Sequence, residues 1–108
     1  FTAGQRMEFV LREDVAAAVA AAARLPETGV QTFNVSGGDT WRMTGQQYSD
    51  AYLAAFQMAP EEGKFIEEST AFDFYDMDAT ITALDFSPTA FAGFIAGVEE
   101  AIRKALEA

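Results

Sequence analysis

Trp41, Arg42 and Met43 are consecutive in the sequence and combine side-chain types that suit ligand contact. An aromatic ring beside an arginine can bind an anionic or a planar group, through paired hydrogen bonds and contact with the ring face. Tyr75 adds a phenolic hydroxyl that can donate to a ligand. We predict that these four residues contact a substrate. The alternative is that Trp41 and Met43 fill the core, Arg42 extends into solvent and Tyr75 packs between helices.

Two other groups of residues have simpler structural explanations. Gly37 and Gly38 follow a predicted strand and could bind a phosphate, but they match neither the dinucleotide nor the P-loop fingerprint. A turn that needs the conformational freedom of glycine explains them. Asp73, Asp76 and Asp78 lack the spacing of an EF-hand loop, and helix capping accounts for the last two. The sequence therefore indicates no catalytic, cofactor-binding or metal-binding residue.

The composition removes most groups that enzymes use for nucleophilic and metal chemistry. The 108 residues include no Cys and no His, so no Ser–His–Asp triad, no Cys–His pair and no zinc site of the usual kinds can form within the chain. The net charge of −10 argues against nucleic acid and anionic membranes as partners, and no apolar run is long enough to span a membrane. Because the absence of Cys fits a reducing compartment, we predict a cytoplasmic protein.

The first third of the chain predicts a βαβ unit. Residues 5–11 alternate between apolar and polar side chains, which places Glu8 on the solvent side of a half-buried strand. The Ala-rich segment 15–25 favours a helix, and residues 30–35 form a second predicted strand. A strand, a helix and a strand in this order join in a parallel, right-handed unit. We predict a single α/β domain over residues 1–108, with a small parallel βαβ unit and additional helices.

The rest of the chain predicts three helices. Thr44 and Gln47 have the spacing of a capping box at the start of the first. A short helix begins at Asp76 or Asp78, and the last helix begins at Ser87, which is followed by a proline in the first helical position. Apolar side chains recur at helical spacing along this last helix, at Phe91, Phe94, Ile95, Val98, Ile102 and Leu106.

Three short segments share their order and spacing with the motifs of a known family. They are residues 9–16 (FVLREDVA), 32–38 (TFNVSGG) and 77–88 (MDATITALDFSP). In this order they resemble the carboxy-terminal, substrate-side part of NAD-dependent epimerases and dehydratases, which belong to the extended short-chain dehydrogenases/reductases. The resemblance covers nearly the whole chain. It implies that the chain is the carboxy-terminal part of that fold and that the Rossmann core is absent from it.

The resemblance also implies what the chain would do. NAD or NADP and the family's Tyr-x-x-x-Lys pair would belong to an amino-terminal dinucleotide-binding half, which would be this chain's partner. The chain itself would bind a small-molecule substrate, such as a sugar, and no cofactor. None of its three tyrosines is followed four residues later by Lys. Met7 stands where members that act on nucleotide sugars carry Arg, which argues against such a substrate.

Two other functions stay open on the sequence alone. The same fold can serve a non-catalytic regulator that binds a dinucleotide or a protein, and a Tyr-x-x-x-Lys pair in the other half would separate an enzyme from it. The chain could also be a stand-alone interaction module that forms a homodimer through its apolar helix stripes. It begins at Phe1 rather than at a Met, as expected for a piece of a longer protein.

Overall fold

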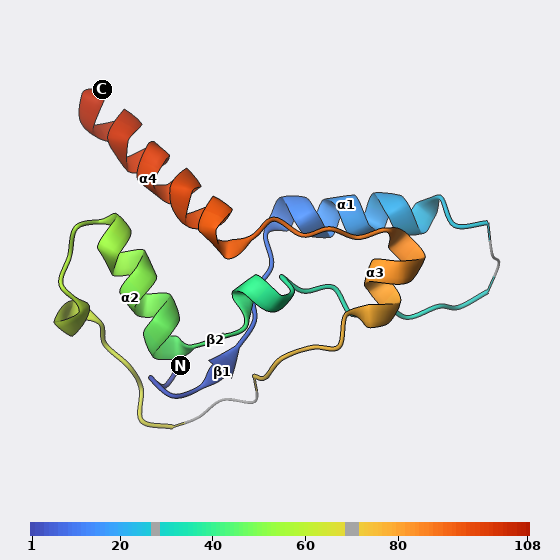
Figure 1. The fold of residues 1–108 in the computed structure, drawn as a ribbon, viewed down its shortest axis with the longest axis horizontal. Helices are drawn as coiled ribbons and strands as arrows, with labels where there is room; N and C mark the ends of the chain where they lie inside the picture. Colours follow the sequence, from blue (N-terminus) through green and yellow to red (C-terminus); the bar gives the residue numbers. More distant parts are fainter. Residues whose placement is uncertain (27–28, 69–71) are drawn as a thin grey trace.

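Four helices and one short pair of strands make up the described structure. The computed structural model describes residues 1–26, 29–68 and 72–108. Figure 1 shows α1 and α3 on one side of the molecule, α2 and α4 on the other, and the strands between them. The elements in chain order are β1 (Arg6–Met7), α1 (Arg12–Ala23), a 3₁₀ turn (Asp39–Trp41), β2 (Met43–Thr44), α2 (Gly45–Ala55), a second 3₁₀ turn (Pro60–Glu62), α3 (Asp78–Leu84) and α4 (Phe91–Glu107). None of these helices has the length and apolarity that crossing a membrane requires.

The prediction of an α/β fold with a parallel βαβ unit is wrong. β1 pairs with β2 rather than with residues 30–35, and the two strands are antiparallel. The register is Arg6 with Thr44 and Met7 with Met43. A parallel sheet needs cover on both faces. Here Phe33 and Val35 pack on one side against the residues that join α1 to α3, while Asn34 between them is exposed. Of residues 30–35, Phe33 and Val35 therefore pack against the helices, no strand forms there, and the fold is mostly helical.

Two clusters of packed side chains hold the helices together. In the α1–α3 cluster, Ala18 of α1 packs with Met77, Leu84 and Phe86 around α3. The aromatic cluster joins α2 to α4, and the centroids of its neighbouring rings lie 5.0–6.5 Å apart, a range in which aromatic pairs stabilise beyond their burial. Its members are Trp41, Tyr48, Tyr52, Phe91 and Phe94. Each cluster therefore fixes one pair of helices.

The capping box predicted at the start of α2 is confirmed. The Thr44 hydroxyl accepts from the Gln47 backbone N–H at 3.2 Å, and the Gln47 side-chain oxygen accepts from the Thr44 N–H at 2.9 Å. We expect Thr44→Ala to lower the free energy of unfolding by about 1 kcal/mol, because it leaves one amide of the first turn without an acceptor. Denaturant titration followed by circular dichroism measures the change.

Thr82→Ala is the matched control for this prediction. Thr82 is exposed on α3 and has no part in a cap. Its replacement is expected to change the free energy of unfolding by no more than about 0.5 kcal/mol. Equal losses at the two positions would show that the box contributes nothing beyond an ordinary surface threonine.

The prediction that the last helix begins at Ser87 is wrong, because α4 begins at Phe91. Contacts from distant parts of the chain hold the preceding residues outside the helix. The Asp14 carboxylate accepts from the Thr89 N–H at 2.7 Å and from the Thr89 hydroxyl at 3.0 Å. The Thr89 carbonyl in turn accepts from Trp41 Nε1 at 2.8 Å. The residues before α4 thus form an extended strap that ties α1 to the aromatic cluster.

The molecule is open and flat. Its radius of gyration is 16.5 Å and its extents are 50 × 39 × 16 Å, whereas a compact chain of this length has a radius of about 13 Å. Its accessible surface is 7381 Å², against about 5,900 Å² for a compact protein of the same mass. The exposed apolar side chains include Val30, which is 99% exposed, and Leu106 at 82%. The excess of roughly 1,500 Å² is more than the ~800 Å² that one partner buries in a standard interface.

Candidate functional site

Arg42 is held in one orientation by three acceptors from three parts of the chain. It lies between the first 3₁₀ turn and β2. Its Nε donates to Glu8 Oε1 at 2.8 Å, its Nη2 to the Tyr75 carbonyl at 2.6 Å, and its Nη1 is 3.1 Å from Asp39 Oδ1. The hydrogen bond that Arg42 donates to Glu8 is the main reason that the pKa of Arg42 lies above its ordinary value, and nearby carboxylates add to it. The guanidinium is therefore a fixed cation whose two remaining N–H groups are free of these three contacts.

Glu8 is the residue of this site that the sequence pattern places wrongly. Alternation along residues 5–11 predicts an exposed side chain, yet the Glu8 side chain has no exposed surface, while Phe9, predicted to be buried, is 37% exposed. The ion pair with Arg42 explains the inward position, since a buried carboxylate needs a cation. Its second oxygen, Oε2, is buried and has no hydrogen-bond partner among the described residues. The spacing of 34 residues between Glu8 and Arg42 carries no local signal that could reveal the pair.

A second arginine shares an aromatic ring with Arg42. The guanidinium carbon of Arg6 lies 4.4 Å from the centroid of the Phe74 ring, and that of Arg42 lies 5.8 Å from it. Arg6 Nε is also 3.1 Å from Asp73 Oδ1. Cation–π contacts at these distances are weakly favourable at exposed sites. The segment around Phe74 is thereby held close to β1.

Trp41 and Met43, two of the four residues predicted to contact substrate, lie in the interior. Trp41 is 3% exposed, and Met43 is also buried. The Trp41 ring meets those of Phe91 and Phe94 at 5.0 and 5.3 Å between centroids. Contact between a substrate and these two residues stays a prediction. In the described structure they fix the backbone on both sides of Arg42.

Tyr75 lies next to Arg42, and contact between a substrate and these two residues stays a prediction. The contact uses the backbone carbonyl of Tyr75, and its phenol side chain is not needed for it. The residue is 44% exposed. Asp76, the next residue, accepts from the Asp78 N–H at 3.0 Å, so its carboxylate orders the approach to α3. No described residue makes a hydrogen bond with the phenolic hydroxyl of Tyr75.

A cavity of about 240 Å³ lies beside Arg42, between the first 3₁₀ turn and α3. Its wall includes the loop of residues 37–40, Met77 and Ile81 at α3, and Pro88 and Ala90 before α4. Its charged residues are Arg42, Asp39 and Asp78. A guanidinium stays protonated in proteins, so Arg42 can orient a ligand but cannot transfer a proton. The role that Arg42 can take in this cavity is therefore ligand positioning.

The comparisons with known proteins add no family to this geometry. Neither protein-family models nor curated proteins nor solved structures give a match to the chain.

Proposed function

We propose that this chain is the substrate-binding lobe of an NAD(P)-dependent epimerase, dehydratase or reductase, and that it works against a separate dinucleotide-binding half. The observation that carries the proposal is the exposed surface, which exceeds that of a compact chain by roughly 1,500 Å². An excess of this size suits a large interface with a second unit. The order of the segments at residues 9–16, 32–38 and 77–88 is what suggests the nature of that unit.

The loop at Gly37 does not fit the pyrophosphate of a dinucleotide. A pyrophosphate binds where glycines open the N-terminus of a helix to a ligand. Gly37 instead makes room for atoms of this chain, since a Cβ there would lie 2.0 Å from the Phe9 carbonyl oxygen and 2.4 Å from Trp41 Cγ. The proposal therefore assigns NAD or NADP to the other half, and it gives this chain no step in hydride transfer.

In this proposal the cavity beside Arg42 forms one wall of the substrate cleft. Arg42 is already fixed by its three acceptors, so it loses little conformational freedom when a substrate such as a sugar binds. Tyr75 accepts from Arg42 through its carbonyl, and Trp41 and Met43 are buried on either side of Arg42 in the sequence. The contribution of the chain is to orient the substrate and to remove it from water.

Titration of NADH and of NADPH by calorimetry tests the proposal on this chain and on the longer protein that contains it. We expect the longer protein to bind one of the two cofactors and this chain alone to bind neither. If the longer protein binds neither cofactor, or if this chain alone binds one as tightly as the longer protein does, the proposal is wrong.

A further inference from the structure

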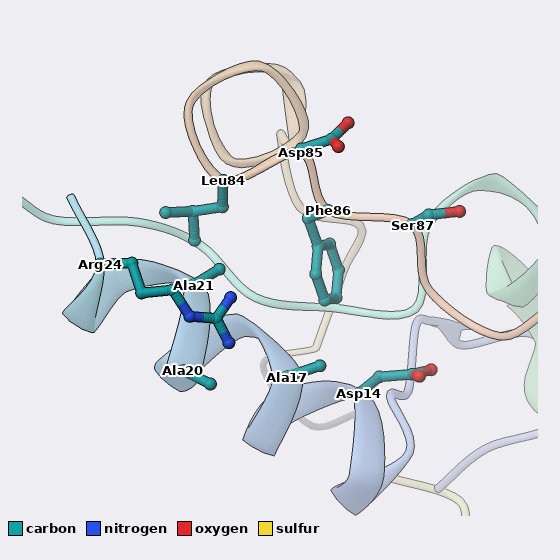
Figure 2. A pocket seen from close by; sticks show the side chains of 9 residues that line it. All are labelled: Asp14, Ala17, Ala20, Ala21, Arg24, Leu84, Asp85, Phe86 and Ser87. Carbon is teal, nitrogen blue, oxygen red and sulfur yellow. The ribbon is translucent and has the colours of Figure 1, made fainter.

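A second and larger cavity lies between α1 and the end of α3. It holds about 440 Å³, within the range of roughly 300–1,000 Å³ typical of small-molecule sites. Figure 2 shows the methyl groups of α1 facing a wall made by the residues that follow α3, with the Phe86 ring pointing towards α1. The floor consists of Ala17, Ala20 and Ala21, and the opposite wall includes Leu84 and Phe86. Three small side chains beside one ring make a flat apolar surface.

Arg24 is the charged residue whose head lies over this surface. Figure 2 shows its guanidinium beside Ala20 and Ala21, whereas the Asp14 carboxylate lies at the far end of the row and Asp85 points away from α1. The cavity therefore presents its positive group over the apolar floor and its negative groups at the edge. A cation at this end of α1 also suits the helix dipole, which accounts for the residue type but not for the cavity.

Asp14 in α1 and Arg24, the residue that follows α1, differ in the hydrogen bonds that they already make. Asp14 is occupied, because its carboxylate accepts twice from Thr89. The Arg24 side chain, by contrast, has no hydrogen bond or ion pair with any residue of the described ranges 1–26, 29–68 and 72–108. No described residue therefore occupies any of the five N–H donors of the guanidinium.

We propose that this cavity binds a small molecule that carries a carboxylate on a flat apolar body, such as an aromatic carboxylate. The planar guanidinium of Arg24 matches a carboxylate through two parallel hydrogen bonds. An aromatic ring lies flat on the Ala floor and meets the ring of Phe86 at its edge or in an offset stack. The inference depends on this cavity alone, and it holds whether or not the chain works with a dinucleotide-binding half.

Three probes with one ring and different charges test the ligand class by calorimetric titration. They are benzoate, benzyl alcohol and benzylamine. We expect benzoate to bind with a Kd near or below about 1 mM, the alcohol to bind at least tenfold more weakly because it lacks the charge, and the amine not to bind. Absence of benzoate binding would overturn the inference, as would equal or tighter binding of either other probe.

Variants along α1 locate the binding site. Arg24→Gln is expected to weaken benzoate binding about tenfold or more, and Ala17→Leu, which fills the floor, is expected to abolish it. Arg12→Gln changes the exposed arginine at the other end of the same helix and should leave the affinity unchanged. Circular dichroism confirms that each variant keeps its helices. Benzoate binding that survives both Arg24→Gln and Ala17→Leu would rule out this cavity as the site.

Discussion

Replacing Arg42 with Met should lower the midpoint of thermal unfolding by roughly 10 °C, because it leaves the buried Glu8 carboxylate without its cation. Met keeps much of the length of the Arg stem, so the change tests the charge more than the packing. The Glu8 side chain has no exposed surface, and none of the residues that the structure describes is a partner of its second oxygen. Solvent reaches Arg42, whose side chain is 34% exposed, and for that reason we expect a loss at the low end for a broken buried pair. Circular dichroism on heating measures the midpoint.

A second substitution separates the buried charge from the other contacts of Arg42. In the double variant with Glu8→Leu and Arg42→Met, both charged groups are gone, so we expect a large part of the loss to be recovered. Arg12→Met is the surface control, since that arginine pairs with Glu13 in full contact with solvent and such pairs contribute little. If Arg42→Met were no worse than Arg12→Met, the pair with Glu8 would have no structural role.

Sequence reasoning succeeds here where a feature depends on neighbouring residues. The capping box of Thr44 and Gln47 spans three residues, and its two hydrogen bonds form as predicted. The short helix predicted at Asp76 or Asp78 begins at Asp78, whose N–H donates to the Asp76 carboxylate two residues earlier. Patterns of this kind report backbone preferences that the rest of the fold does not override.

The failures are contacts between residues far apart in the chain. Ser87 was a sound candidate for the start of a helix, but Asp14, 75 residues before Thr89, holds the strap outside α4. The alternation of residues 5–11 describes a half-buried strand but does not identify its partner, and β2 takes the place predicted for residues 30–35. Strand pairing depends on which other elements cover the sheet, and a short sequence pattern does not specify them.

The candidate sites divide in the same way. Arg42 and Tyr75 could be named from residue type alone, and the structure brings them together. Glu8 could not, because only the fold reveals that a carboxylate predicted to face solvent is the main partner of Arg42. Arg24 carries no signal either, since an arginine near the end of a helix usually serves the helix itself. The proposed role of Arg24 in ligand binding rests on the cavity beside it.

Gly37→Ala is the second substitution with a large expected effect. A Cβ at this position would lie 2.0 Å from the Phe9 carbonyl oxygen and 2.4 and 2.5 Å from two atoms of the Trp41 ring. None of these neighbours can swing away, since one is backbone and the ring is buried and bound through Nε1 to the Thr89 carbonyl. The backbone itself must shift, so we expect a loss of about 3 kcal/mol in the free energy of unfolding. Denaturant titration measures it.

Gly97→Ala supplies the opposite expectation for the same chemical change. Gly97 lies within α4, and a Cβ there would meet nothing within 4 Å. Alanine restricts the unfolded chain and favours the helix, so this variant is expected to gain about 0.5–1 kcal/mol. The two variants therefore separate the steric clash of a Cβ at residue 37 from the destabilisation that glycine causes in any helix. A Gly37→Ala variant as stable as the unchanged chain would mean that Phe9, Trp41 and the loop before Arg42 do not meet as described, and the cavity beside Arg42 would then lose the wall that the proposed substrate site requires.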